Sequence, residues 1–187
     1  MAVAVKLDFD KAYHIDPVTN DLRVSTFETE LQDGSFVPLK VEISRQPHEL
    51  VPTVFNLAFG PVNDKGEIDD KAEIQHKDYS KVFSSILLAG LTYLSHNDHH
   101  YLGIDGSTNA RAYLYYRFLQ KNFDYLNKFI DVYGLKYYVR ISRFGKSQYD
   151  NPFDFNDILP GTEKIGRDTR IMSNLMYNYF IFNLKRE

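Results

Sequence analysis

The 187-residue chain contains no cysteine and no tryptophan. The lack of cysteine excludes disulfide bonds, thiolate metal sites and cysteine nucleophiles, and it favours the cytoplasm as compartment. No stretch approaches the roughly 18 apolar residues that a membrane-spanning helix needs, so we expect no membrane association. The N-terminal stretch MAVAVKLDFDKAYH is too short and too soon charged for a secretory signal. We therefore expect a cytoplasmic protein.

Familiar catalytic signatures are also missing, since there is no Gly-x-Ser-x-Gly, P-loop, His-Glu-x-x-His or dinucleotide-binding glycine motif. The net charge of −3 gives no overall attraction for nucleic acid. The charge is unevenly distributed, because residues 111–146 hold eight Lys and Arg against two acids, whereas residues 61–80 hold six acids against three bases. These segments either face each other in the fold or leave a basic surface for a ligand.

Phenylalanine and tyrosine are abundant, with 14 residues of each in a composition that is 43% hydrophobic. This composition supplies a sizeable core and excludes wholesale disorder. The length fits a single domain over residues 1–187.

Hydrophobic periodicity predicts strands at 22–31, 36–44 and 52–60, with a hairpin turn at Asp33-Gly34 and a Pro-bounded loop over 45–52. A short strand is expected around 71–75. The following helix is capped by Asp78 or Ser80. Its apolar face carries Phe83, Ile86, Leu87, Gly90, Leu91 and Leu94.

A strand at 101–105 leads into a second helix, expected from 107–109 to about Ile130, with Gly134 as its stop. Residues 136–144 read as a strand, 145–176 as a long loop or insertion with one or two helical turns in 168–176, and 177–186 as a final strand. The order β-β-β-β-α-β-α-β-β predicts an α+β fold with one mixed, largely antiparallel sheet and two main helices. The predicted apolar stripe of the second helix is Leu114, Phe118, Tyr125 and Phe129, widened by Tyr115, Leu119 and Leu126.

Several motifs occur together in a fixed order. They are Phe-Asn-Leu-Ala-Phe-Gly at 55–60, Gly-Glu-Ile-Asp-Asp at 66–70, Asp78 with Lys81-Val82, Gly-Ser-Thr-Asn-Ala-Arg at 106–111 before Leu114-Tyr115, Val132-x-Gly134, and Asn178-Tyr179 with Phe182. In these motifs the chain resembles small uncharacterised bacterial proteins grouped only as a domain of unknown function, over roughly residues 13–144 and 177–186. It departs from them at 75–78, where Asn-Asn-Gly-Asp is usual, and at Ala112, where Thr is usual. The resemblance implies a fold more than an activity.

The order of elements also looks like the second half of the GCN5-type acetyltransferase fold. Those enzymes carry Arg/Gln-x-x-Gly-x-Gly/Ala before the first of the matching helices, and this motif is absent from the segment 75–85. Without those glycines the backbone amides are not arranged to hold a pyrophosphate. The similarity is therefore one of topology, and it implies no cofactor.

The strongest candidate site is the helix start Gly106, Ser107, Thr108, Asn109 and Arg111. Glycine followed by Ser, Thr and Asn at a helix start offers free N–H groups and hydroxyls at the positive end of the helix dipole. Arg111 falls in the first turn, where its charge opposes that dipole and calls for compensation. The stretch can be a plain helix cap, Arg111 can pair with an internal carboxylate, or it can bind an anion such as a phosphate. The internal partners would be Asp69, Asp70 or Asp105, and we prefer such a partner to an anion.

Three weaker patterns each have a structural and a functional interpretation. The carboxylates of 67–70 suit a hard cation or acid–base chemistry, but a solvated turn is preferred because no third ligand stands at a telling spacing. His96, His99 and His100 form a cluster that resembles a metal site, in which His96 and His100 are four residues apart, yet Asn97-Asp98 suggests that the helix has ended by then. Tyr138 and Arg140 could stack nucleic-acid bases, although a packed sheet face is preferred. We expect no metal and no cofactor.

Three functions remain open from the sequence. The preferred one is a non-enzymatic binding or interaction module whose partner is another protein or a second copy of itself. An accessory of a bacterial defence or toxin–antitoxin system would be one such module. The second is an enzyme that holds a phosphorylated or CoA-like ligand at 106–111. The third is nucleic-acid binding through the basic region 111–146.

Overall fold

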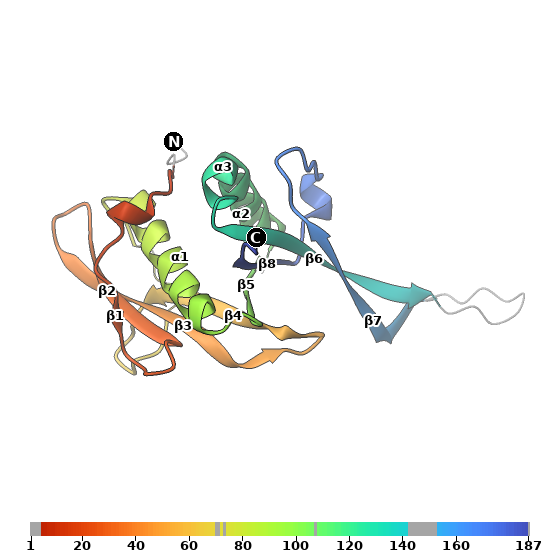
Figure 1. Ribbon diagram of the computed structural model, residues 1–187, viewed down its shortest axis with the longest axis horizontal. Helices are drawn as coiled ribbons and strands as arrows, with labels where there is room; N and C mark the ends of the chain where they lie inside the picture. Colours follow the sequence, from red (N-terminus) through yellow and green to blue (C-terminus); the bar gives the residue numbers. More distant parts are fainter. Residues whose placement is uncertain (1–4, 70–71, 73, 107, 142–152, 187) are drawn as a thin grey trace, which may run out of the picture.

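The computed structural model describes residues 5–69, 72, 74–106, 108–141 and 153–186. Two longer helices, one short helix and eight strands make up this part of the chain (Figure 1). The strands are β1 (Asp16–Pro17), β2 (Val24–Glu30), β3 (Phe36–His48), β4 (Val51–Pro61), β5 (Tyr101–Asp105), β6 (Ile130–Ile141), β7 (Phe153–Lys164) and β8 (Tyr179–Leu184). The helices are α1 (Tyr79–His96), α2 (Asn109–Lys121) and α3 (Phe123–Leu126), with 3-10 turns η1 (Phe9–Lys11) and η2 (Ser173–Leu175).

All eight strands form one sheet in the order β1-β2-β3-β4-β5-β8-β6-β7. Every neighbouring pair is antiparallel except β4 and β5, which are parallel. The fold is therefore α+β with a mixed, largely antiparallel sheet, as the sequence predicts. The last strand, β8, lies inside the sheet between β5 and β6.

The first hairpin forms where the sequence predicts it. The Asp33 carboxylate accepts from the Ser35 N–H at 2.9 Å, and Gly34 has a φ of +83°, which favours glycine. The second hairpin corrects a prediction, because β3 and β4 replace most of the expected loop over 45–52 and leave a tight turn between His48 and Val51. The strands accommodate Pro47 in an irregular register, where the Asn56 N–H donates to the Ser44 hydroxyl at 2.9 Å.

Helix α1 confirms its predicted cap and its apolar face. The Asp78 carboxylate accepts from the Lys81 N–H at 3.0 Å, which satisfies one of the free donors of the first turn. Ile86 and Leu94 are buried at the centre of the apolar face. Of the strand expected around 71–75, residues 71 and 73 lie outside the described residues, and Ile74 and Gln75 belong to no strand.

The second helix is shorter than predicted. Helix α2 ends at Lys121, α3 adds one turn, and β6 begins at Ile130, so Gly134 lies inside a strand and does not stop a helix. A Cβ on Gly134 would lie 2.2 Å from Cδ1 of Tyr177, so the glycine makes room for that ring. Most of the predicted stripe is confirmed, because the core includes or contacts Tyr115, Phe118, Leu119, Tyr125 and Leu126. The prediction is wrong for Leu114 and Phe129, which are 62% and 39% exposed, and Ala112 and Tyr116 are buried in addition.

The predicted loop over 145–176 contains a twelve-residue strand, β7, which pairs with β6. The Asp, Asn, Pro and Gly residues of β7 are typical of loops, which is why the sequence predicts one here. An edge strand tolerates the same residues, because one side of its backbone needs no partner. Residues 142–152 lie outside the described part of the chain. The turn η2 and the strand β8 confirm the remaining predictions for the C-terminal segment.

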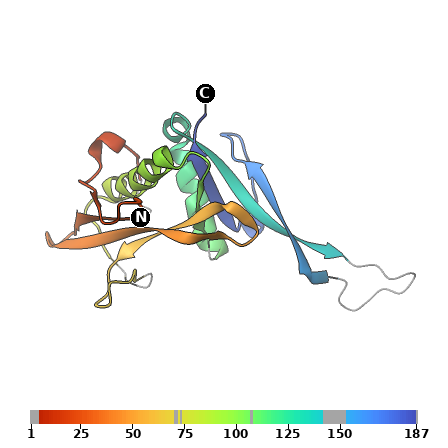
Figure 2. The same ribbon diagram turned by 60° about the horizontal axis from the view of Figure 1, so that its bottom comes forward.

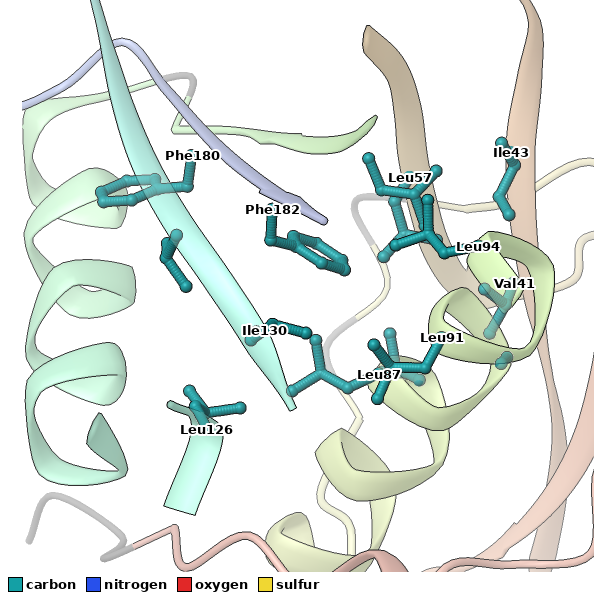
Figure 3. Close-up of a cluster of buried hydrophobic side chains, with 14 of the residues drawn as sticks. Val41, Ile43, Leu57, Leu87, Leu91, Leu94, Leu126, Ile130, Phe180 and Phe182 are labelled. Carbon is teal, nitrogen blue, oxygen red and sulfur yellow. The ribbon is translucent and has the colours of Figure 1, made fainter. Parts of the chain in front are cut away.

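The main core lies between the helices and one face of the sheet. Figure 3 shows Leu87, Leu91 and Leu94 of α1 facing Leu57 of β4 and Phe182 of β8. A smaller cluster occupies the other face and consists of Val54, Leu135, Tyr179 and Ile181. The β6–β7 ribbon extends from this body in both views (Figures 1 and 2). Among the described residues, none of the helices combines the length and the apolar character needed to cross a membrane.

Candidate functional site

Two clefts open where the parallel strands β4 and β5 separate. The strands pair only from Val54 to Asn56 and from Tyr101 to Gly103. Beyond these pairs their carboxyl ends diverge, and such a gap is where open sheets commonly bind ligands. We call the cleft on the helix side the helix-side cleft and the one on the opposite face the aromatic cleft, and each encloses about 480 Å³. Asn56 and Asp105 line both.

The helix-side cleft has both apolar and polar lining residues. Its walls are Leu57 and Phe59 of β4, Ile104 of β5, and Val82 and Phe83 of α1. Its polar lining consists of Asn56, Asp69, His76, Tyr79, Asp105, Arg111 and Tyr115.

Arg111 and Tyr115 form the α2 side of the helix-side cleft. Arg111 is exposed, and among the described residues no carboxylate lies within 4.0 Å of its guanidinium. The Tyr115 ring meets Phe180 edge-on at 6.2 Å between ring centroids, and burial raises the pKa of its hydroxyl. This arrangement offers a fixed positive charge and a neutral hydroxyl to a ligand.

The predicted site at 106–111 is divided between the two clefts. Thr108 is the N-cap, because its hydroxyl accepts from the Arg111 N–H at 3.2 Å, as the capping interpretation predicts. Gly106, Thr108 and Asn109 line the aromatic cleft, whereas Arg111 lines the helix-side cleft. The structure therefore does not gather the arginine and the start of the helix around one anion position. Ser107 lies outside the described residues.

Gly106 is explained by close packing. Its N–H donates to the Asn178 carbonyl at 3.1 Å, and a Cβ at Gly106 would lie 2.7 Å from Cβ of Ala112. The junction between β5 and α2 thus requires a small residue at this point. A glycine in this motif is accounted for without a ligand.

The aspartates expected beside Arg111 have different positions. Asp69 lines the helix-side cleft, and its N–H donates to the Pro61 carbonyl at 2.9 Å. Asp105 ends β5 and lines both clefts. No ion pair within 4.0 Å joins Arg111 to either of these two described residues. Asp70 lies outside the described part of the chain.

The aromatic cleft contains residues that sequence reasoning missed. His48 Nε2 lies 2.8 Å from the Tyr137 hydroxyl, and the two rings are stacked with their centroids 6.1 Å apart. The Tyr179 hydroxyl donates to Oδ1 of Asn56 at 2.6 Å. Asn56 and Tyr179 belong to motifs that carry the family resemblance, and this membership was the sequence signal that could have identified them as site residues. His48 had none, since it falls in a segment that reads as a loop.

The Tyr179 ring can reach Asn56 because the residue of β5 beneath the ring is Gly103, which has no side chain. A Cβ on Gly103 would lie 2.0 Å from Cε1 of Tyr179, so any side chain there would displace the ring. Burial raises the pKa of Tyr179 and of Tyr137, and the negative charge of Asp105 raises both further. Both phenols are therefore neutral hydrogen-bonding groups near neutral pH.

The remaining predicted candidates have structural roles. His100 Nδ1 lies 2.8 Å from the Tyr93 hydroxyl, and His96 Nδ1 lies 3.0 Å from the Thr92 carbonyl. In the described ranges no three His, Asp or Glu side chains are grouped as a metal site would require. In the basic region, Lys136 pairs with Glu163 at 3.6 Å and Arg140 pairs with Asp157 at 3.1 Å.

The comparisons with known proteins give a family but no activity. The sequence model of DUF6934, a family of unknown function, matches residues 10–155. No curated protein matches the chain, and no solved structure matches it.

Proposed function

The chain belongs to DUF6934, a family of unknown function, and we propose that this member binds an anionic small molecule, phosphorylated or CoA-like, in the helix-side cleft. The observation that carries the proposal is Arg111, an exposed guanidinium that lines this cleft without a described carboxylate within 4.0 Å. A planar guanidinium matches a phosphate or carboxylate with two parallel hydrogen bonds. The charge of Arg111 in the first turn of α2, which has no carboxylate within 4.0 Å among the described residues, becomes favourable there once such an anion is bound.

The surroundings of Arg111 support the same ligand. Tyr79 in the first turn of α1 lines the cleft, so the positive end of that helix lies at it. Asp69 and Asp105 add negative charge to the lining, so the anionic group of the ligand would be held by Arg111 itself. The apolar part of the ligand then lies along Phe59 and Ile104.

This proposal refines the binding module preferred from the sequence, with a small molecule as its first ligand. A reaction on the bound phosphorylated or CoA-like molecule is the enzymatic alternative. This cleft has no bearing on two other proposals. One is a role beside a bacterial defence or toxin–antitoxin system, and the other is binding to a protein partner or a second copy of the chain. Nucleic-acid binding is less favoured because Lys136 and Arg140 already have carboxylate partners.

The experiment is a melting-temperature screen with coenzyme A, ATP and inorganic pyrophosphate. At about 100 times its Kd a ligand stabilises the fold by about 2.7 kcal/mol, which raises Tm by roughly 5–10 °C in a domain of this size. For the ligand that does so, Arg111→Gln is expected to raise Kd about tenfold or more, since a hydrogen bond to a charged group contributes about 1.5–3 kcal/mol.

The matched control is Arg117→Gln on the same helix. Arg117 is exposed and lies over the Tyr113 ring, outside the cleft lining, so this change should leave Kd within twofold. The proposal fails if none of the three probes raises Tm, or if Arg111→Gln binds the active probe as tightly as the unmodified protein does.

A further inference from the structure

We infer that the aromatic cleft is a second ligand site and that it takes a primary ammonium group. The inference goes beyond the proposed function, because it concerns the opposite face of the sheet and a ligand of opposite charge. It depends on three features of the cleft: its hydrogen-bond polarity, its charge and its rings.

The first feature is the direction of the hydrogen bonds in the cleft, which His48 determines on one side. The Leu50 N–H donates to His48 Nδ1 at 3.2 Å, so in the neutral imidazole Nε2 carries the proton and donates to the Tyr137 oxygen at 2.8 Å. On the other side of the cleft, the Tyr179 hydroxyl gives its proton to Asn56 Oδ1 at 2.6 Å. The Tyr179 oxygen therefore keeps its acceptor capacity.

The charge of the cleft has one sign. Asp105 is the only Asp, Glu, Lys or Arg among the described residues that line it. The negative charge of Asp105 acts on both phenols, since it raises the pKa of Tyr137 and of Tyr179 after the larger effect of burial. Gly106, Thr108 and Asn109 bring the positive end of α2 to the cleft, but that end amounts to about half a charge and decays within a turn. A full carboxylate charge outweighs it.

The rings complete the site for a cation. His48 stacks on Tyr137 and meets Tyr179 at 59° with 5.3 Å between ring centroids, so three rings adjoin one another in the lining. The faces of tyrosine rings attract cations. An ammonium group has three donors and no acceptor, which matches the carboxylate of Asp105 and the Tyr179 oxygen. An anion would instead meet the negative charge of Asp105.

The test compares n-butylammonium with n-butanol, which has a similar size and no charge. Tyrosine ring signals are followed by NMR during titration of the full chain at low salt. We expect n-butylammonium to shift the signals of Tyr137 and Tyr179 and to bind at least tenfold more tightly than n-butanol. The inference is overturned if both probes bind equally, if neither binds up to 100 mM (roughly the weakest binding a single charged contact would give), or if the shifted signals belong to other tyrosines.

Variants separate the charge from the rings. Asp105→Asn should raise Kd for n-butylammonium about tenfold, while Asp98→Asn, which removes an exposed charge outside this cleft, should leave it within twofold. Tyr137→Phe keeps the ring and should bind within twofold of the unmodified protein, whereas Tyr137→Ala should bind several-fold more weakly. Equal binding by Asp105→Asn and the unmodified protein would contradict the inference even if every Tyr137 variant behaved as expected.

Discussion

At the scale of single residues, Asn122 joins the N-terminal segment to the helices. Its amide is buried, and Oδ1 accepts from the Leu7 N–H at 2.9 Å. Its Nδ2 donates to the Phe118 carbonyl at 3.0 Å and to the Val5 carbonyl at 3.2 Å. One side chain thus satisfies backbone groups from two distant segments at the point where α2 gives way to α3.

We predict that Asn122→Ala lowers the free energy of unfolding by about 2 kcal/mol, because it leaves the buried Leu7 N–H without its acceptor. Urea denaturation followed by circular dichroism measures the change. Gln75→Ala is the control, since Gln75 is exposed and should change the value by less than about 0.5 kcal/mol. A loss for Asn122→Ala as small as that of the control would refute the role assigned to this amide.

At the scale of elements, β5 shows how a short strand determines a site on its neighbours. The Tyr179 ring of β8 crosses β5 over Gly103 and ends at Asn56 of β4. One hydrogen bond therefore joins β8 to β4 across β5, and Gly103 leaves the space that the ring needs to cross. The same strand delivers Asp105 to both clefts.

Gly103→Ala should displace the Tyr179 ring and break its hydrogen bond to Asn56, because the new Cβ would lie 2.0 Å from Cε1. We expect a loss of about 1–3 kcal/mol in the free energy of unfolding, together with weaker binding of n-butylammonium. Gly166→Ala serves as the comparison, since its Cβ would meet nothing nearer than the Thr169 hydroxyl at 3.6 Å. If both alanines were tolerated alike, the clearance argument would be wrong.

The elements also show how far the sequence determines the fold. Helix α1 was predictable from cap to apolar face because one face of it is buried along its whole length, so its periodicity is regular. The region after α2 was not, because Tyr125 and Phe129 continue a helical spacing into a segment that α3 and β6 occupy. Strand β7 escaped notice for a related reason, as an edge strand with Pro160 and Gly161 has the composition of a loop.

The candidate site was predictable only in part. The motif at 106–111 drew attention to the junction of β5 and α2, and that junction does separate the two clefts. His48 and Tyr137 could not be found in the same way, because 89 residues separate them and only tertiary folding brings them together. Periodicity gives the face of a strand but not the residue opposite it on a distant hairpin.

At the scale of the whole molecule, two histidines make stability depend on pH. Burial lowers the pKa of His76, and burial together with the nearby Arg23 lowers that of His100. The unfolded chain therefore takes up protons near pH 6.5 that the folded chain does not bind. This contribution to stability is present above that pH and is lost as the pH falls through the folded pKa values.

We therefore predict that the free energy of unfolding decreases between pH 7 and pH 5. Urea denaturation at several pH values gives the slope, which should become flatter in the double variant His76→Asn/His100→Asn. His99→Asn changes an exposed histidine and should keep the slope of the unmodified protein. The pKa values of Asp8, Asp21 and Asp33 are lowered by their hydrogen bonds, so these three carboxyl groups titrate below this window. A stability that is flat from pH 7 to pH 5 would contradict the prediction.

The position of β8 has a consequence for biosynthesis. Residues 179–184 fill the gap between β5 and β6, so the ribosome must deliver them before the sheet can close. Until then the nascent chain exposes two strand edges and the apolar residues that Phe180 and Phe182 later cover. At about 5–20 residues per second, this vulnerable interval lasts for seconds after α1 has emerged. Contacts so distant in sequence also form slowly, which prolongs the exposure of these edges.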